Sequence, residues 1–149
     1  MSRMNMTRAV LGGLVAGLVI NIGESVLNLV VIESQVNAQF ARLQLPPMTG
    51  GVIAVFVALC FLLGIATIWT YAAIRPRFGA GPKTAIVAAA LIWFTAYVFP
   101  GVSQVAMGLF PAQVTAVALL WGAMELAIAA VAGASIYQEP AAYGRAAGI

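Results

Sequence analysis

The chain has 149 residues, of which 63% are hydrophobic and 7% are charged, and its formal net charge is +3. An ordinary soluble domain carries roughly 25% charged residues, so this composition predicts a single membrane-embedded domain and excludes a second, soluble one. Because there is no histidine and only one cysteine, the usual metal ligand sets are missing, and we expect no metal centre and no cofactor.

The first apolar run, residues 9–32, predicts the first membrane span. Four polar side chains interrupt it, and their spacing of i, i+3, i+4 and i+7 places them on one face of a helix: Asn21, Glu24, Ser25 and Asn28. In hydrocarbon such groups are costly unless they meet one another, a partner helix or water. We therefore expect this face to point into protein or into a wet cavity.

The same run contains Gly13 and Gly17, a G-x-x-x-G pair that lets a second helix approach closely. Four short helices enclose little space, so we expect a homo-oligomer, for which a dimer is the simplest closed form, or a place in a larger membrane complex.

The segment 33–45 is polar but keeps apolar residues at helical spacing, at Val36, Phe40 and Leu43. This pattern predicts either a helical overhang of the first span or an amphipathic helix in the membrane interface, ended by two prolines.

The second span is predicted over residues 49–74, with Thr49 as its N-cap. We expect it to end at Arg75, because the residue before a proline is disfavoured in helical geometry and Pro76 comes next. The connection after it is the most basic part of the chain and contains Arg75, Arg77 and Lys83. These cations are expected to bind anionic lipid headgroups.

From residue 84 to 138 the only charge is Glu125, and this length is far greater than one span needs. Pro100 and Pro111 mark the expected break, which gives spans at 82–99 and 112–137 with a short interfacial helix between them.

The cations indicate the orientation, since one side holds six and the other holds only Arg42. The six are Arg3, Arg8, Arg75, Arg77, Lys83 and Arg145. The positive-inside rule then predicts an inner cell membrane protein with both termini in the cytoplasm and interfacial helices on the outer side. Cations at the ends of apolar runs indicate topology, so we expect no nucleic-acid partner.

Glu24 and Glu125 are the two carboxylates inside the predicted spans, where no lysine, arginine or histidine can pair with them. Each must be hydrogen-bonded, hydrated or protonated, which suits either a proton or cation site or polar glue between helices. Trp121 lies one helical turn before Glu125. Bulky packing against glycine and alanine is the favoured interpretation of this side chain, and the alternative is a hydrogen bond from its indole N–H to a carboxylate or carbonyl.

The predicted fold is therefore all-α, a bundle of four transmembrane helices. In its length and in the glutamate within its first helix, the chain resembles the small multidrug-resistance transporters in architecture, with no residue roles implied. We expect a proton-linked permease or channel whose polar site contains Asn21, Glu24, Asn28 and Glu125. The alternative is a non-catalytic subunit or assembly factor of a larger membrane complex. An enzyme is not expected, since no nucleophile–base pair is visible.

Overall fold

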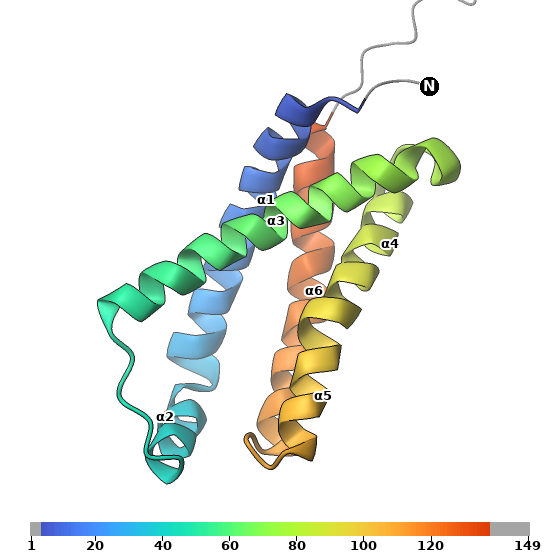
Figure 1. Cartoon of the computed structure of the whole chain (residues 1–149). Helices are drawn as coiled ribbons and strands as arrows, with labels where there is room; N and C mark the ends of the chain where they lie inside the picture. The colour runs from blue at the N-terminus through green and yellow to red at the C-terminus, as the bar shows by residue number, and fades with distance from the viewer. Residues whose placement is uncertain (1–3, 138–149) are drawn as a thin grey trace, which may run out of the picture.

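The computed structural model describes residues 4–137, and every regular element in that part of the chain is helical (Figure 1). The elements are α1 (Met6–Val26), the π-helical segment η1 (Leu27–Val31), α2 (Glu33–Arg42), α3 (Gly50–Phe78), α4 (Pro82–Trp93), the π-helical segment η2 (Phe94–Val98), α5 (Phe99–Ala106) and α6 (Ala112–Ile136). Four continuous helices, at residues 6–31, 50–78, 82–106 and 112–136, are long and apolar enough to cross a bilayer. The predicted all-α, four-span class is confirmed.

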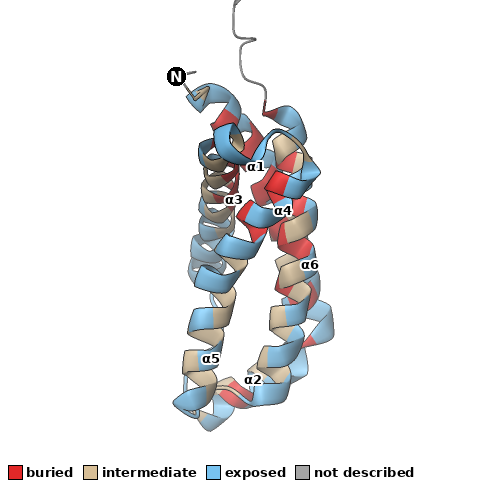
Figure 2. Cartoon of the chain, turned by 90° about the vertical axis from the view of Figure 1, so that its right-hand side faces the viewer, coloured by how far each residue is buried: buried red, intermediate tan, exposed pale blue. Residues whose placement is uncertain are grey.

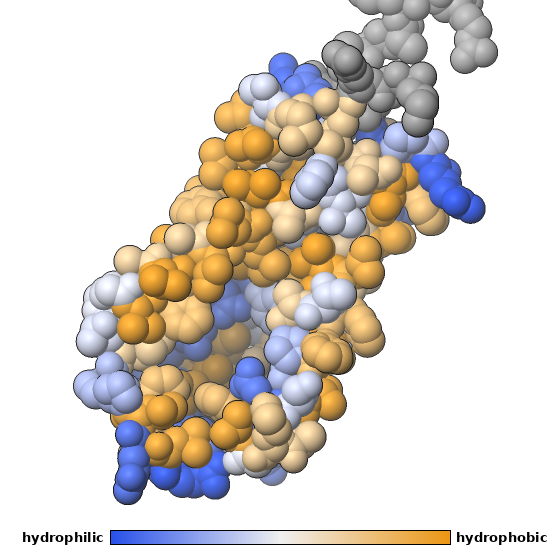
Figure 3. Space-filling model, viewed as in Figure 1, coloured by the Kyte–Doolittle hydropathy of each residue, from blue (hydrophilic) through white to orange (hydrophobic). Residues whose placement is uncertain are grey.

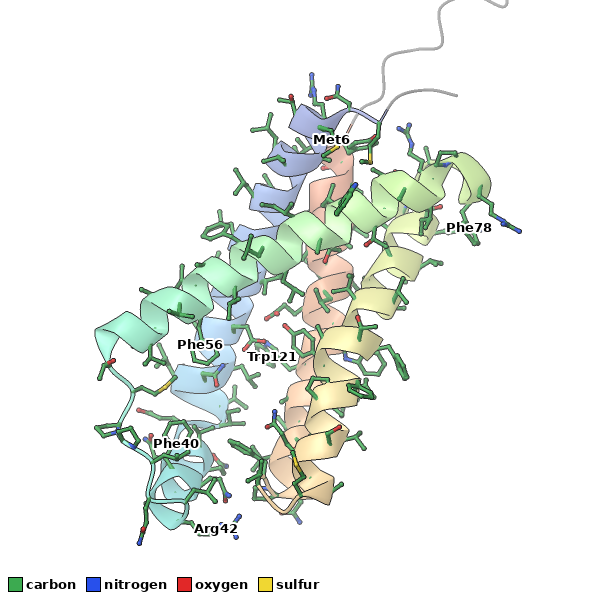
Figure 4. The ribbon with its side chains drawn as sticks, in the orientation of Figure 1. Met6, Phe40, Arg42, Phe56, Phe78 and Trp121 are labelled. Carbon is green, nitrogen blue, oxygen red and sulfur yellow. The ribbon has the colours of Figure 1, made fainter. Side chains whose placement is uncertain are left out.

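The start of α1, the α3–α4 turn and the end of α6 lie at one end of the molecule, here called the terminal end (Figure 1). Met6 and Phe78 are at this end in Figure 4, whereas Arg42 is at the opposite, α2 end. The backbone N–H of Asn5 donates to the hydroxyl of Tyr137 over 3.4 Å, which joins the two chain ends of the bundle. A chain with an even number of spans begins and ends on the same side of the membrane, which agrees with the position of both described chain ends at the terminal end.

Glycines hold α1 against α3. A Cβ added to Gly64 would fall 2.6 Å from the Cα of Gly17, and one added to Gly13 would fall 2.5 Å from the Cα of Ile65. No side chain fits in such a gap, so the two backbones touch at this crossing. The G-x-x-x-G pair therefore packs within the chain, and a homo-oligomer would have to form through another face.

A second glycine contact joins α1 to α6, where a Cβ on Gly12 would lie 2.5 Å from the carbonyl oxygen of Gly133. Around the two contacts, small and aliphatic side chains from all four long helices form the core. Figure 2 shows that the buried residues are concentrated toward the terminal end. They include Ala16, Ile20, Ile68, Ala88, Leu126 and Ala129.

Beyond the crossing, α3 diverges from the bundle toward the α2 end (Figure 1). Residues 50–59 are all exposed, and Val55 retains 58% of its accessible surface. The side-chain amide of Asn21 donates to the carbonyl of Val57 over 3.3 Å, and this bond still ties the diverging part to α1. The first third of this helix thus presents apolar side chains to the surroundings of the chain.

Thr49 caps α3 as predicted, since its hydroxyl accepts the N–H of Val52. The expected end of the helix at Arg75 is wrong, because α3 continues through Pro76 to Phe78. A proline in the last turn removes one hydrogen bond without disturbing the helix that precedes it. The N–H of Gly79 then bonds the carbonyl of Arg75 over 2.8 Å and closes the final turn.

The expected break before Pro100 is also absent, because residues 82–106 form one continuous helix. The chain widens into η2, where the N–H of Phe99 reaches the carbonyl of Phe94, and Pro100 comes directly afterwards. A π segment accommodates a residue without an N–H, so the proline is absorbed without a break. The short helix expected between the third and fourth spans is therefore α5, the end of the third.

The separate short helix is α2, and side-chain hydrogen bonds hold it to the α5–α6 turn. The Arg42 guanidinium donates to the carbonyl of Gly108 over 2.7 Å and to Gln39 over 3.2 Å. The Gln39 amide in turn donates to the carbonyl of Leu109. These bonds draw together the first and third long helices at the α2 end.

Replacing Gly64 with alanine should destabilise the chain by about 1–3 kcal/mol, because the added methyl meets the backbone of α1. The measurement is the free energy of unfolding in mixed detergent micelles, monitored by circular dichroism. Gly51→Ala is the matched control, since the nearest atom to its Cβ is 3.9 Å away. Equal stability of the two variants would show that the crossing is not tightly packed.

Candidate intramembrane carboxylate site

Glu24 is held by side chains from two of the long helices. The amide of Asn28, one turn later, donates to its Oε2 over 2.9 Å, and the hydroxyl of Tyr97 lies 3.0 Å from its Oε1. Both carboxyl oxygens therefore have a partner, one from the same helix and one from η2. The expectation that the carboxyl would find hydrogen bonds is met within the chain.

Glu125 lies on α6 opposite, and its side chain is buried. The indole N–H of Trp121 donates to its Oε2 over 3.2 Å, and Tyr97 lies 3.4 Å from its Oε1. Gly23 provides the space, because a Cβ there would lie 2.7 Å from the Cδ of Glu125. The favoured interpretation of Trp121 as packing alone is therefore wrong, and the alternative hydrogen bond is present, with a carboxylate as the acceptor.

Tyr97 joins the two acids, although they lie on different helices. Its ring packs on Gly122, where a Cβ would come within 2.6 Å of the ring carbon Cδ1. A phenol has one proton to donate, so its hydroxyl donates to one carboxylate, while the other contact is a hydrogen bond only if that carboxyl carries a proton and donates to the phenol oxygen. The three groups can thus share one added proton in two ways. Either Glu24 carries it and Tyr97 donates to Glu125, or Glu125 carries it and Tyr97 donates to Glu24.

Two of the predicted site residues lie apart from this cluster. Ser25 is exposed, and its hydroxyl donates to the carbonyl of Asn21 on its own helix. The Asn21 amide donates to the carbonyl of Gly17 as well as to α3. Both residues therefore stabilise helix backbone, whereas Glu24 and Asn28 meet Tyr97 and, through it, the second acid.

The two π segments carry two of the three polar groups that contact the acids, since Asn28 belongs to η1 and Tyr97 to η2, while Trp121 belongs to α6. A π segment is rare and is frequently found at functional sites. Here each one changes the direction in which its polar side chain points. Their pairing across the bundle marks this level of the molecule as the candidate site.

A cavity of about 310 Å³ extends from the carboxylate site to the α2 end. Asn28 and Tyr97 line its inner part, while Phe40 on α2 and Phe56 on α3 line it farther out. Figure 3 shows the hollow on the face that Figure 1 presents, between α3 and the α2 end. Neither acid is among the described lining residues, so Tyr97 and Asn28 stand between the carboxyl groups and this space.

The three cations expected to bind lipid headgroups all lie at the terminal end. Arg77 and Lys83 are exposed, while Arg75 is partly buried with its guanidinium 5.5 Å from the centre of the Tyr137 ring. Such a cation–π contact orients the arginine beside the bundle. Within residues 4–137, no group of three or more histidine, cysteine or acidic residues lies close enough to hold a metal ion.

Tyr97, the residue that connects the site, was not among the residues predicted from the sequence. The signal was available, because a phenol in the middle of an apolar span needs a hydrogen-bond partner as much as an indole does. The indole of Trp93, in the same span, also has a hydrogen-bond partner, since its N–H donates to the carbonyl of Leu119 over 2.8 Å. The direction in which the Tyr97 side chain points could not be predicted from the sequence, because it depends on the π segment η2.

Comparison with protein-family models, with curated proteins and with solved structures finds no match to this chain. Its class is defined by the fold alone. The four long apolar helices define a multi-pass helical membrane protein. Within it, two acids from different helices meet at one tyrosine.

Tyr97→Phe should lower the free energy of unfolding by about 1–3 kcal/mol, because it leaves one oxygen of each acid without its partner while the ring still fills the space at Gly122. In a double-mutant cycle with Glu24→Leu, the coupling energy should exceed 0.5 kcal/mol, a threshold of about the usual additivity error. Glu33→Leu is the control partner, since Glu33 is exposed on α2. Additive effects in both cycles would contradict the shared hydrogen bond.

Proposed function

We propose that this protein is a small proton-linked permease or channel, with Glu24, Tyr97 and Glu125 as its proton-binding group. The supporting observation is the Tyr97 hydroxyl, which lies within 3.4 Å of one oxygen from each acid. Two carboxyls joined through a phenol can accept a proton and pass it from one helix to another by exchanging hydrogen bonds. Acids placed within membrane helices commonly serve proton pathways.

The cavity gives the proton group a route toward one side of the membrane. It ends at Tyr97 and Asn28, which contact the acids directly, and it reaches the α2 end. Toward the terminal end, the tightly packed core closes the bundle, with Ile20, Ile68 and Leu126 fully buried. We infer an arrangement that is open to one side and closed to the other, as alternating access requires.

We further propose that the terminal end faces the cytoplasm of an inner cell membrane and that the basic α3–α4 turn contacts anionic lipid there. Of the cations that the structure describes, Arg8, Arg75, Arg77 and Lys83 are at this end and Arg42 is at the other. Arg3 and Arg145, which the sequence count also used, lie outside the described residues.

A second candidate function is that of a non-catalytic subunit or assembly factor. It is favoured by the apolar surface of α3 at residues 50–59, all of which are exposed. A stoichiometric larger partner recovered after mild detergent extraction would favour this role over transport.

Glutamine in place of Glu24 or Glu125 keeps the shape and much of the hydrogen bonding but cannot take up a proton. In proteoliposomes with an entrapped pH-sensitive dye and an imposed pH gradient, each variant should reduce proton flux to the level of protein-free vesicles. Glu33→Gln, at an exposed position on α2, should retain the wild-type flux. Wild-type flux in both site variants would show that the acids only hydrogen-bond the helices together. The transport proposal would then be rejected, and the subunit role would remain.

The proposed orientation predicts that a reporter fused after Ile149 behaves as cytoplasmic, with green fluorescence and no alkaline phosphatase activity. The physical reason is the asymmetry of the cations between the two ends. Phosphatase activity from the fusion would reverse the orientation.

A further inference from the structure

The cavity contains polar side chains that no protein group satisfies. Gln104 on α5 and Thr115 on α6 both line it, and neither side chain has a hydrogen bond to any described residue. The amide nitrogen of Asn28 is engaged with Glu24, while its carbonyl oxygen has no donor among the described residues. Three separate elements thus direct free donors and acceptors at one space, which is otherwise lined mainly by apolar side chains.

The electrostatics of this space suit an uncharged occupant. No lysine, arginine, aspartate or glutamate is among its described lining residues, so an anion would find no counter-charge. A cation would meet no carboxylate in the lining either, because Tyr97 and Asn28 lie between this space and the oxygens of Glu24 and Glu125. Polar groups that are neither charged nor satisfied match hydroxyl, ester or amide groups.

The shape and position of the cavity suit a molecule that is dissolved in the bilayer. Its outer wall includes Phe40, Met48 and Phe56, and Met48 and Phe56 lie next to the part of the chain where α3 diverges. The hollow is visible from outside at this level (Figure 3). A volume of about 310 Å³ is at the small end for ligand pockets. It accommodates one hydrocarbon chain and a small head rather than a whole two-chain lipid.

We propose that the cavity binds an uncharged single-chain amphiphile that enters from the bilayer beneath α3, with its hydroxyl or carbonyl head at Asn28, Gln104 and Thr115 and its chain against the phenylalanines. This assignment builds on the proposed transport function, because it names the substrate class that the same site would carry. Binding and proton flux are nevertheless separate measurements.

The test uses the full chain in phosphatidylcholine vesicles and three photoreactive diazirine probes with the same acyl or alkyl chain length. One is a monoacylglycerol, one an anionic lysophosphatidylglycerol and one a cationic alkylamine. The monoacylglycerol should label peptides around Gln104 and Thr115 saturably and several-fold more than either charged probe. Unlabelled monoacylglycerol should compete. Uniform, non-saturable labelling of lipid-facing positions, or preference for a charged probe, would overturn the assignment.

Variants add a second readout. Gln104→Leu and Thr115→Val should each lower saturable labelling by about fivefold, the effect of one lost hydrogen bond. Thr95→Val is the matched control, because the Thr95 hydroxyl is exposed and bonds carbonyls of its own helix. An equal effect of Thr95→Val and Thr115→Val would contradict the assignment. Competition on the wild-type chain decides the question if a variant fails to fold.

The two proposals fail separately. Saturable labelling by monoacylglycerol without pH-dependent proton flux would reject transport and retain the binding site. Proton flux without saturable labelling would reject the binding site and retain the proton group.

Discussion

The backbone contact between α1 and α3 determines how the remaining space in the molecule is divided. Because Gly13 and Gly17 touch α3 at Gly64, the two helices cross toward the terminal end and separate beyond it. The terminal end can then fill with small side chains, whereas the opposite half cannot close against α3. The polar face of α1 consequently meets η2 and α6, and the cavity occupies the volume that α3 leaves. This crossing therefore leaves the accessible space at whose inner end Glu24 and Tyr97 lie.

The carboxylate site shows how a membrane protein tolerates two acids without a cation. Each oxygen is in contact with a polar side chain, and packing fixes the central groups: the Tyr97 ring lies on Gly122, and Glu125 fits against Gly23. Small residues here do more than bring helices together, since they make room for a ring and a carboxyl at the same depth. An indole, a phenol and an amide replace the water that the acids would otherwise require.

The all-α membrane class, the four spans and the position of two acids within those spans could be predicted from the sequence, because charge and hydropathy dominate in a bilayer. The sequence was also sufficient for the Thr49 cap, which depends on local spacing. The same kind of spacing offered the Trp121–Glu125 hydrogen bond only as an alternative to packing. The predictions from the sequence were wrong or incomplete where the backbone departs from a regular α-helix. Pro76 and Pro100 read as breaks but lie within continuous helices, and the direction of Tyr97 depends on η2. Ser25 shares the spacing of the polar face, yet hydrogen-bonds only its own helix.

The π segment η2 also sets the rotational phase of the helical turns that come after it, in α5. A π segment contains one residue more than the α-helix it interrupts, and one residue corresponds to about 100° of rotation about the axis. Gln104 therefore faces the cavity only because of the extra residue in η2, and a polar position chosen by regular α-helical counting from α4 would point elsewhere. For the same reason, the gain or loss of a single residue in Phe94–Val98 would rotate the α2-end half of the third long helix as a unit. Such a change would alter which side chains line the cavity while leaving the terminal core in place.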